Sequence, residues 1–179
     1  ISLDVSQAIA DILARLLGGE SGALVSDAGT PAISDPGEDL VRLCMDSGVS
    51  VCPVPGPSAL VAALSASGLP TQRFTFEGFL STSRKSRAEH LEDIKSERRT
   101  MVFYEAPHKL ARTLRDLLDA LGDRELTLCR ELTKLHEEIW RTTFSEALAR
   151  YEENPPRGEF VLVVRGAESR EHLAEAMTD

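Results

Sequence analysis

The sequence predicts an α/β fold in two domains, the first on a parallel sheet and the second an α+β domain on a mixed sheet. Over residues 1–71, apolar residues at helical spacing alternate with short apolar runs, as in βα units joined by right-handed crossovers. The break Gly68-Leu69-Pro70-Thr71 ends this alternation, so we expect the domain boundary there. Strands and helices follow less regularly over residues 72–166, and residues 167–179 form a charged tail.

The first domain is expected to begin with a helix over residues 5–17, where one apolar stripe recurs at helical spacing before Gly18-Gly19. The apolar runs 22–26 and 49–54 have the length of buried strands. Between these runs, Asp35-Pro36 predicts the start of a second helix, because Asp35 can cap the first turn and proline suits the first helical position.

A third helix is expected over residues 58–67, which are rich in small side chains and are followed by Gly68, a typical helix stop. In the second domain, the clearest helix begins at Pro107 and ends before Gly122, with leucines at core spacing between them. The remaining expected elements are strands at residues 73–80, 100–104, 126–129, 139–144 and 160–164, and helices at 81–99 and 145–151.

Composition narrows the class of protein. The chain has 179 residues, 42% of them hydrophobic, and a formal net charge of −9, so any contact with nucleic acid must come from a local basic patch. The cysteines Cys44, Cys52 and Cys129 fit no metal-binding spacing, and we interpret them as reduced core residues of a cytoplasmic protein without a metal site. No apolar run reaches membrane-spanning length, and the dinucleotide-binding pattern G-x-G-x-x-G is absent.

Two loops have the composition of a ligand site. Residues 26–37, S-D-A-G-T-P-A-I-S-D-P-G, follow the first apolar run, and P-G-P-S-A at residues 55–59 follows the second. Ligands bind at the carboxyl ends of strands in open α/β sheets, and Gly29 and the small residues after Pro57 permit close approach. The alternatives are an ordinary turn between strand and helix, and small residues that serve tight helix packing.

Six motifs in this order carry a family resemblance: the two loops above, F-E-G-F-L at 76–80, F-Y-E-A-P-H-K-L at 103–110, R-E-L-T-K-x-H-E-E at 130–138 and G-E-F-V-L-V-V at 158–164. Over residues 1–166 the chain resembles the 16S rRNA cytidine 2′-O-methyltransferases, a family of the tetrapyrrole (corrin/porphyrin) methylase superfamily. The resemblance implies a two-domain tetrapyrrole-methylase-like fold. Members of the family begin with a strand, a P-x-G-N-type loop and an E-D-T-R segment that this sequence lacks, so we expect Ile1 to fall inside the first domain.

The resemblance also implies a methyl donor, S-adenosylmethionine, held between the two domains, and a homodimer that acts on 16S rRNA of the small ribosomal subunit. Such a site recognises the donor by its shape, through small residues and backbone groups. The residues that the resemblance assigns to donor binding are Asp27, Ala28, Gly29, Ile33, Ser58, Ala59, Ala106 and Leu132.

The catalytic candidates are the polar residues that follow the strand at 126–129. A ribose hydroxyl must lose its proton as the methyl group is transferred. Lys134 could lower the pKa of that hydroxyl or bind phosphate, and Glu131 or Glu137 could accept the proton. The alternative is that Arg130, Glu131 and Lys134 form a structural ion-pair network at the strand end.

The most basic stretch of the chain is residues 81–99, and the best RNA candidates are Arg84, Lys85 and Arg87 at its start. The alternative is a solvated helix face whose acidic residues pair with the basic ones. Two other functions stay open: a methylase that acts on a tetrapyrrole, although such enzymes typically carry G-D-P in the first loop, and a non-catalytic fragment.

Overall fold

The computed structural model describes residues 3–168, with side chains from residue 7 onward. The chain divides into two compact units, Ile1–Ser58 and Ala59–Asp179. Helix α3 (Ala59–Ala66) therefore belongs to the second compact unit. The domain boundary expected after residue 71 stays a prediction. The charged tail at residues 169–179 lies outside the described residues.

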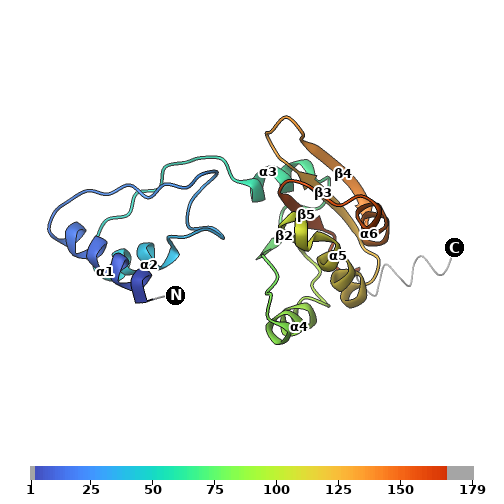
Figure 1. The fold of residues 1–179 in the computed structure, drawn as a ribbon, viewed down its shortest axis with the longest axis horizontal. Coiled ribbons are helices and arrows are strands. Elements are labelled where there is room, and N and C mark those ends of the chain that lie inside the picture. Colours follow the sequence, from blue (N-terminus) through green and yellow to red (C-terminus); the bar gives the residue numbers. More distant parts are fainter. Residues whose placement is uncertain (1–2, 169–179) are drawn as a thin grey trace. The chain divides into compact units, whose positions relative to one another are not determined.

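The first unit contains helices α1 (Leu3–Leu17) and α2 (Glu38–Asp46), which contact each other (Figure 1). Helix α1 confirms the predicted first helix. The two apolar runs at 22–26 and 49–54 are not strands, and Val25 and Val54 are 82% and 86% exposed. A strand exists only through ladder hydrogen bonds to a neighbour, and residues 3–58 provide no such neighbour.

Helix α2 begins later than Asp35-Pro36 predicted. Its N-cap is Gly37, with a φ of 126°, and no side chain caps it. A Cβ at Gly37 would lie 2.5 Å from Cδ2 of Leu24, so glycine serves both the backbone conformation and the close approach of Leu24. The chain turns sharply here before the helix can start, because Ser34 also has a positive φ of 53°.

The second unit is built on a five-stranded mixed sheet in the order β1-β2-β5-β3-β4, as expected for the second domain (Figure 1). Strand β1 pairs with β2 in parallel, and the other neighbours are antiparallel. The central strand β5 is apolar throughout because both faces of the sheet are covered. The strands are β1 (Phe74–Gly78), β2 (Thr100–Glu105), β3 (Glu125–Arg130), β4 (Glu138–Thr143) and β5 (Phe160–Val164).

Helices cover the two faces of the sheet in three layers. On one face, Ala63 and Leu64 of α3 pack against Val102, Val161 and Val163. The other face carries the larger core, made with helices α4 (Arg84–Asp93), α5 (Pro107–Leu121) and α6 (Phe144–Glu153). Side chains of adjacent residues in one strand therefore pack against the helices of opposite faces.

Two further details differ from the predictions. The helix expected over residues 81–99 is shorter, because α4 ends at Asp93. All three cysteines are free, and Cys44 and Cys129 are buried as predicted, but Cys52 is exposed because the run 49–54 is not a buried strand. None of the helices within residues 3–168 combines the length and the apolar character that a membrane span needs.

Candidate active site at the carboxyl edge of the sheet

One edge of the sheet gathers the ends of β2 and β3. Glu105, the last residue of β2, pairs with Phe160, which pairs with Arg130, the last residue of β3. Both β2 and β3 are antiparallel to β5, so their carboxyl ends meet at this edge. The loop that follows each strand holds predicted site residues, Ala106 after β2 and residues 131–137 after β3. The topology therefore brings these two motifs together.

The start of α3 is tied to the same edge. The backbone N–H of Leu60 donates to the hydroxyl of Tyr104, 2.9 Å away. The Tyr104 ring packs edge-to-face against Phe76, with centroids 5.0 Å apart. Leu132, Leu60 and Tyr104 all pack against the same buried cluster on this face of the sheet. The predicted donor residues Ala59, Ala106 and Leu132 thus belong to one edge of the second unit.

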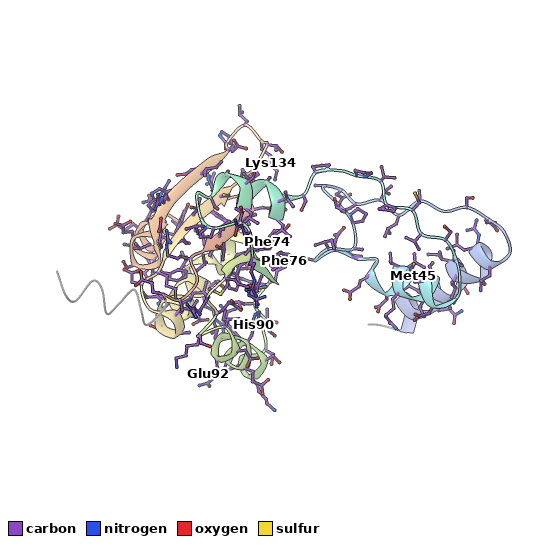
Figure 2. The ribbon with its side chains drawn as sticks, turned by 180° about the vertical axis from the view of Figure 1, so that it is seen from behind. Met45, Phe74, Phe76, His90, Glu92 and Lys134 are labelled. Atoms are coloured by element: carbon purple, nitrogen blue, oxygen red, sulfur yellow. The ribbon has the colours of Figure 1, made fainter. Side chains whose placement is uncertain are left out.

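The loop between β3 and β4 is braced by charged side chains. Glu131 and Thr133 have positive φ values of 50° and 66°, which side chains rarely adopt. The amide of Glu131 donates to the carbonyl of Glu159 at 3.0 Å, and Oε1 of Glu131 accepts from the amide of Glu159 at 2.9 Å. Nζ of Lys134, labelled in Figure 2, lies 3.0 Å from Oε1 of Glu131 and 2.8 Å from Oε2 of Glu159. These contacts hold an otherwise unfavourable loop in one conformation.

The network shifts the pKa values of Glu131 and Lys134 in opposite directions. The Glu159 N–H, and then the Lys134 ammonium, hold the pKa of Glu131 below its usual value. The carboxylates of Glu159 and Glu131 raise the pKa of Lys134. The lowered pKa makes Glu131 a weaker proton acceptor than an ordinary glutamate, and the raised pKa keeps Lys134 charged. Within residues 3–168, the Glu137 carboxylate accepts one hydrogen bond, from the Thr133 N–H at 2.6 Å, and the backbone N–H of Glu137 donates to the Lys134 carbonyl at 3.1 Å.

In the first unit the two predicted donor loops also meet. The hydroxyl of Thr30 donates to the carbonyl of Pro57 at 3.0 Å, and a Cβ at Gly29 would lie 3.5 Å from the same oxygen. This contact places the turn that contains the predicted residues next to Ser58. The predicted donor residues of this unit are Asp27, Ala28, Gly29, Ile33 and Ser58.

The predicted RNA cluster separates into exposed and buried members. Arg84 and Lys85 lie exposed in the first turn of α4, and Lys85 is 3.8 Å from Glu89. Arg87 differs from the expectation, because it is only 6% exposed. Its guanidinium faces the core between α4 and α5, where Asp116 and Thr113 accept its hydrogen bonds. It has no free face for a phosphate.

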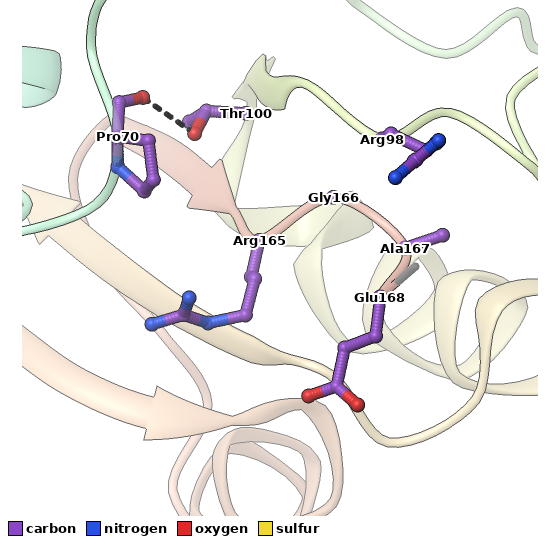
Figure 3. A pocket seen from close by; sticks show the side chains of 7 residues that line it. All are labelled: Pro70, Arg98, Thr100, Arg165, Gly166, Ala167 and Glu168. Carbon is purple, nitrogen blue, oxygen red and sulfur yellow. Dashed lines mark hydrogen bonds between the residues drawn. The ribbon is translucent and has the colours of Figure 1, made fainter. Parts of the chain in front are cut away.

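Two shallow hollows lie at the opposite edge of the sheet, away from this site. The first, of about 210 Å³, is lined by Arg98, Arg165 and the neighbours of Gly166, and Thr100 donates to the Pro70 carbonyl at its wall (Figure 3). Arg165 is already paired with Glu125. Both hollows are lined by acidic as well as basic side chains, which partly cancel each other's charge.

Sequence reasoning missed Glu159, Gly158 and Thr113. Gly158 has a φ of 87°, and a Cβ there would lie 2.4 Å from Cγ of Glu131. The sequence at 158–164 predicts only a strand and a family motif, whereas Gly158 and Glu159 brace the Glu131 loop in the structure. Only the order of strands in the sheet reveals this neighbour relationship.

The comparisons with known proteins agree on one family. Tetrapyrrole (Corrin/Porphyrin) Methylases match residues 3–148. The chain is 54% identical over 158 residues to "Ribosomal RNA small subunit methyltransferase I" of Synechocystis sp., covering 88% of this chain and 57% of that protein. It is 48% identical over 160 residues to the protein of the same name from Thermotoga maritima, covering 89% of this chain and 72% of that protein.

A solved structure of the same fold is uroporphyrin-III C-methyltransferase from Thermus thermophilus, complexed with S-adenyl homocysteine. The TM-score is 0.59 at 19% identity, over 88% of this chain and 72% of that chain. At this identity the likeness concerns the fold. The chain spans 57% of the length of the Synechocystis protein and 72% of the length of each of the two Thermotoga and Thermus proteins.

Proposed function

The chain belongs to the tetrapyrrole (corrin/porphyrin) methylase family, and from that membership we propose that it acts as an S-adenosylmethionine-dependent methyltransferase on rRNA of the small ribosomal subunit. The acceptor is the ribose 2′-OH of a cytidine in 16S rRNA. The single observation that carries the proposal is the 48% identity to the Thermotoga maritima protein, of which this chain spans 72%. The carboxyl edge of the sheet is where the chemistry is assigned.

The donor is assigned to the two groups of small residues, those of the first-unit loops and those at the carboxyl edge. The sulfonium of S-adenosylmethionine already makes the methyl group electrophilic, so the chain does not have to activate the donor. It has to bind the donor, orient the acceptor hydroxyl and exclude water. Ala59, Ala106 and Leu132 offer apolar surface at the edge, which suits a flat adenine and a thioether. Asp27 and Ser58 add polar groups that can fix the orientation of the donor.

The acceptor chemistry is assigned to the loop after β3. The charged Lys134 ammonium lowers the pKa of a nearby ribose hydroxyl, because it stabilises the alkoxide that forms during transfer. Glu137 is the better proton acceptor of the two predicted carboxylates, because Glu131 is held by Glu159 and Lys134. Glu131 then acts by positioning Lys134.

The RNA is assigned to the exposed pair Arg84 and Lys85, and a homodimer in the cytoplasm would present two such pairs. With a net charge of −9, a single pair supplies little long-range attraction, so a second copy would enlarge the positive surface. Sedimentation at micromolar concentration tests this point, since a purely monomeric chain contradicts the dimer.

Isothermal titration of this chain with S-adenosylhomocysteine tests the donor assignment. We expect saturable binding of one molecule per chain, and weakened binding in Ala106→Phe, whose ring would occupy the space assigned to the donor. Arg115→Ala, on the exposed side of α5, is the control and should bind as the parent does. A chain that is folded but gives no saturable heat contradicts the proposal. Stabilisation by a porphyrinoid instead would favour a tetrapyrrole substrate.

A further inference from the structure

Glu105, the last residue of β2, carries a buried carboxylate that is 3% exposed. Its Oε1 accepts from the backbone N–H of Ala106 at 2.8 Å, and its Oε2 accepts from the hydroxyl of Thr113 in α5. Thr113 is itself 1% exposed. The carboxylate therefore joins the turn after β2 to the second turn of the helix that follows.

The chain of hydrogen bonds continues into α4. The Thr113 hydroxyl oxygen accepts from Nη2 of Arg87 at 2.8 Å. Nε of Arg87 donates to Oδ2 of Asp116 at 2.6 Å, and Nη1 donates to the Ser81 carbonyl at 3.4 Å. One buried network thus connects the loop after β1, helices α4 and α5, and the end of β2.

The direction of each hydrogen bond in this network is fixed. A guanidinium has only donors, so the Thr113 oxygen must accept from Arg87. The single hydroxyl proton of Thr113 is then committed to Glu105. Serine could replace threonine here because it also donates and accepts, whereas valine has the same shape and can do neither.

Stability alone is a weak reason for such a network. A buried ion pair costs desolvation, and an apolar replacement of the whole set is often neutral or stabilising. An apolar set could not hold the Ala106 N–H, however. The Ala106 carbonyl accepts from the Lys109 N–H at 3.0 Å, so both peptide groups of Ala106 are fixed and its methyl group is the part left to face a ligand.

We propose that Glu105, Thr113 and Arg87 are positioning residues for the methyl donor: through the Glu105–Ala106 hydrogen bond they hold the Ala106 methyl group as a rigid wall of the donor site. This inference rests on the proposed function, in which Ala106 contacts the donor. None of the three residues has to touch the donor, because Glu105 and Arg87 are buried below the edge.

The test compares Thr113→Val with Thr113→Ser in the whole chain, by titration with S-adenosylhomocysteine and by amide hydrogen exchange over residues 105–109. Thr113→Val breaks both links of the hydroxyl, so we expect exchange at Ala106 to rise about tenfold and donor affinity to fall about tenfold. Thr113→Ser keeps both links and should stay within about twofold of the parent in both measurements. A residue that serves stability only would lower the melting temperature and leave the donor affinity of the folded chain unchanged.

The outcomes separate this inference from the proposed function. A parent chain that binds S-adenosylhomocysteine, with Thr113→Val binding equally well, overturns the positioning role and leaves the proposed function intact. A parent chain that binds no donor, while Thr113→Val still accelerates exchange at Ala106, overturns the proposed function and with it the role of the network in donor binding. Should Thr113→Val fail to fold, Glu105→Gln replaces it: its amide oxygen can hold the Ala106 N–H, but its NH₂ cannot accept the Thr113 proton. We then expect a loss of about threefold in affinity, and an unchanged affinity overturns the inference.

Discussion

Glu131 and Glu159 exchange two hydrogen bonds, one in each direction, where the end of β3 meets the start of β5. The Glu131 N–H donates to the Glu159 carbonyl at 3.0 Å, and the Glu131 carboxylate accepts from the Glu159 N–H at 2.9 Å. Lys134 closes the set by reaching both carboxylates. The proposed catalytic lysine is therefore held by the residue that follows β3 and the residue that precedes β5, which lie 28 residues apart in sequence.

Gly158→Ala should destabilise the protein and loosen the Glu131 loop. Alanine there is strained twice, because φ is 87° and the new Cβ would lie 2.4 Å from Cγ of Glu131. The matched control is Gly122→Ala, at a φ of 77° with open space around the position. Gly122 has a ψ of 178°, a conformation that is nearly restricted to glycine, so we expect about 1–3 kcal/mol of lost stability in the control from backbone strain alone. The Gly158 variant should lose about 1–3 kcal/mol more through overpacking, as measured by urea unfolding. Equal losses of unfolding free energy in the two variants would contradict a steric conflict between the new Cβ at position 158 and the Glu131 side chain.

Arg87→Leu and Lys85→Leu should differ sharply in stability, although both residues belong to one basic stretch. Removing the Arg87 guanidinium leaves the buried Thr113 hydroxyl without its donor, at a cost of about 1–3 kcal/mol. Asp116 is partly exposed and keeps the longer contact to Arg112, so its share of the loss is small. Lys85 is exposed and makes one long ion pair, so its loss should cost less than about 0.5 kcal/mol. Similar values for the two variants in urea unfolding would contradict the buried position of Arg87.

Arg84→Glu and Lys85→Glu should weaken the binding of 30S particles if this pair contacts phosphate. Each removed contact should reduce the slope of log affinity against log salt by about one. Lys95→Glu changes the charge equally beyond the end of α4 and serves as the control. An equal loss in all three variants would point to a general charge effect instead of a local RNA contact.

Glu97 should make stability depend on pH in the acid range. Hydrogen bonds from the Arg99 guanidinium lower the pKa of Glu97 from 4.5 to about 2. A carboxylate whose pKa is lower in the folded state stabilises the fold above its unfolded pKa, and that contribution is lost as pH falls from about 4.5 towards 2. Glu97→Gln should therefore reduce the dependence of unfolding free energy on pH in this window. An unchanged pH profile would contradict the Arg99 contact.

Thiol labelling should distinguish the three cysteines. Cys52 is exposed and should react in the native protein, whereas Cys44 and Cys129 are buried and should react only on unfolding. Burial, and then the charge of Glu137, raises the pKa of Cys129 to about 11. Mildly alkaline pH should therefore not convert this thiol to the reactive thiolate. Mass spectrometry of the labelled peptides identifies the thiol, and rapid native labelling of Cys129 would contradict the described core.

The elements with strong local signals were predictable from sequence. Pro107 and Gly122 mark the two ends of α5, and the alternation at residues 74–78 marks β1. The apolar run at 22–26 has the composition of a strand, but composition does not supply the neighbour that a ladder needs. Local sequence also cannot separate Arg87 from Arg84, because only the packing of α4 on α5 decides which of them is buried.

The position of the polar loop after β3 was predictable, and the contact with Glu159 that braces it was not. The motif at 130–138 places Glu131, Lys134 and Glu137 after a strand, and the alternative of an ion-pair network was visible in the same residues. Glu159, which completes the network, follows 28 residues after Glu131 and becomes a neighbour only through the position of β5 between β2 and β3.

Methyl transfer from labelled S-adenosylmethionine to undermethylated 30S particles tests the central claim most directly, with the label mapped by mass spectrometry of the digested 16S rRNA. The account predicts a methyl group on the ribose of a cytidine, and a turnover reduced at least about a hundredfold in Lys134→Met with unchanged donor affinity. A methyl group on a base, or transfer that does not depend on Lys134, would contradict the assigned chemistry. Donor binding without any transfer to rRNA would contradict the assigned substrate.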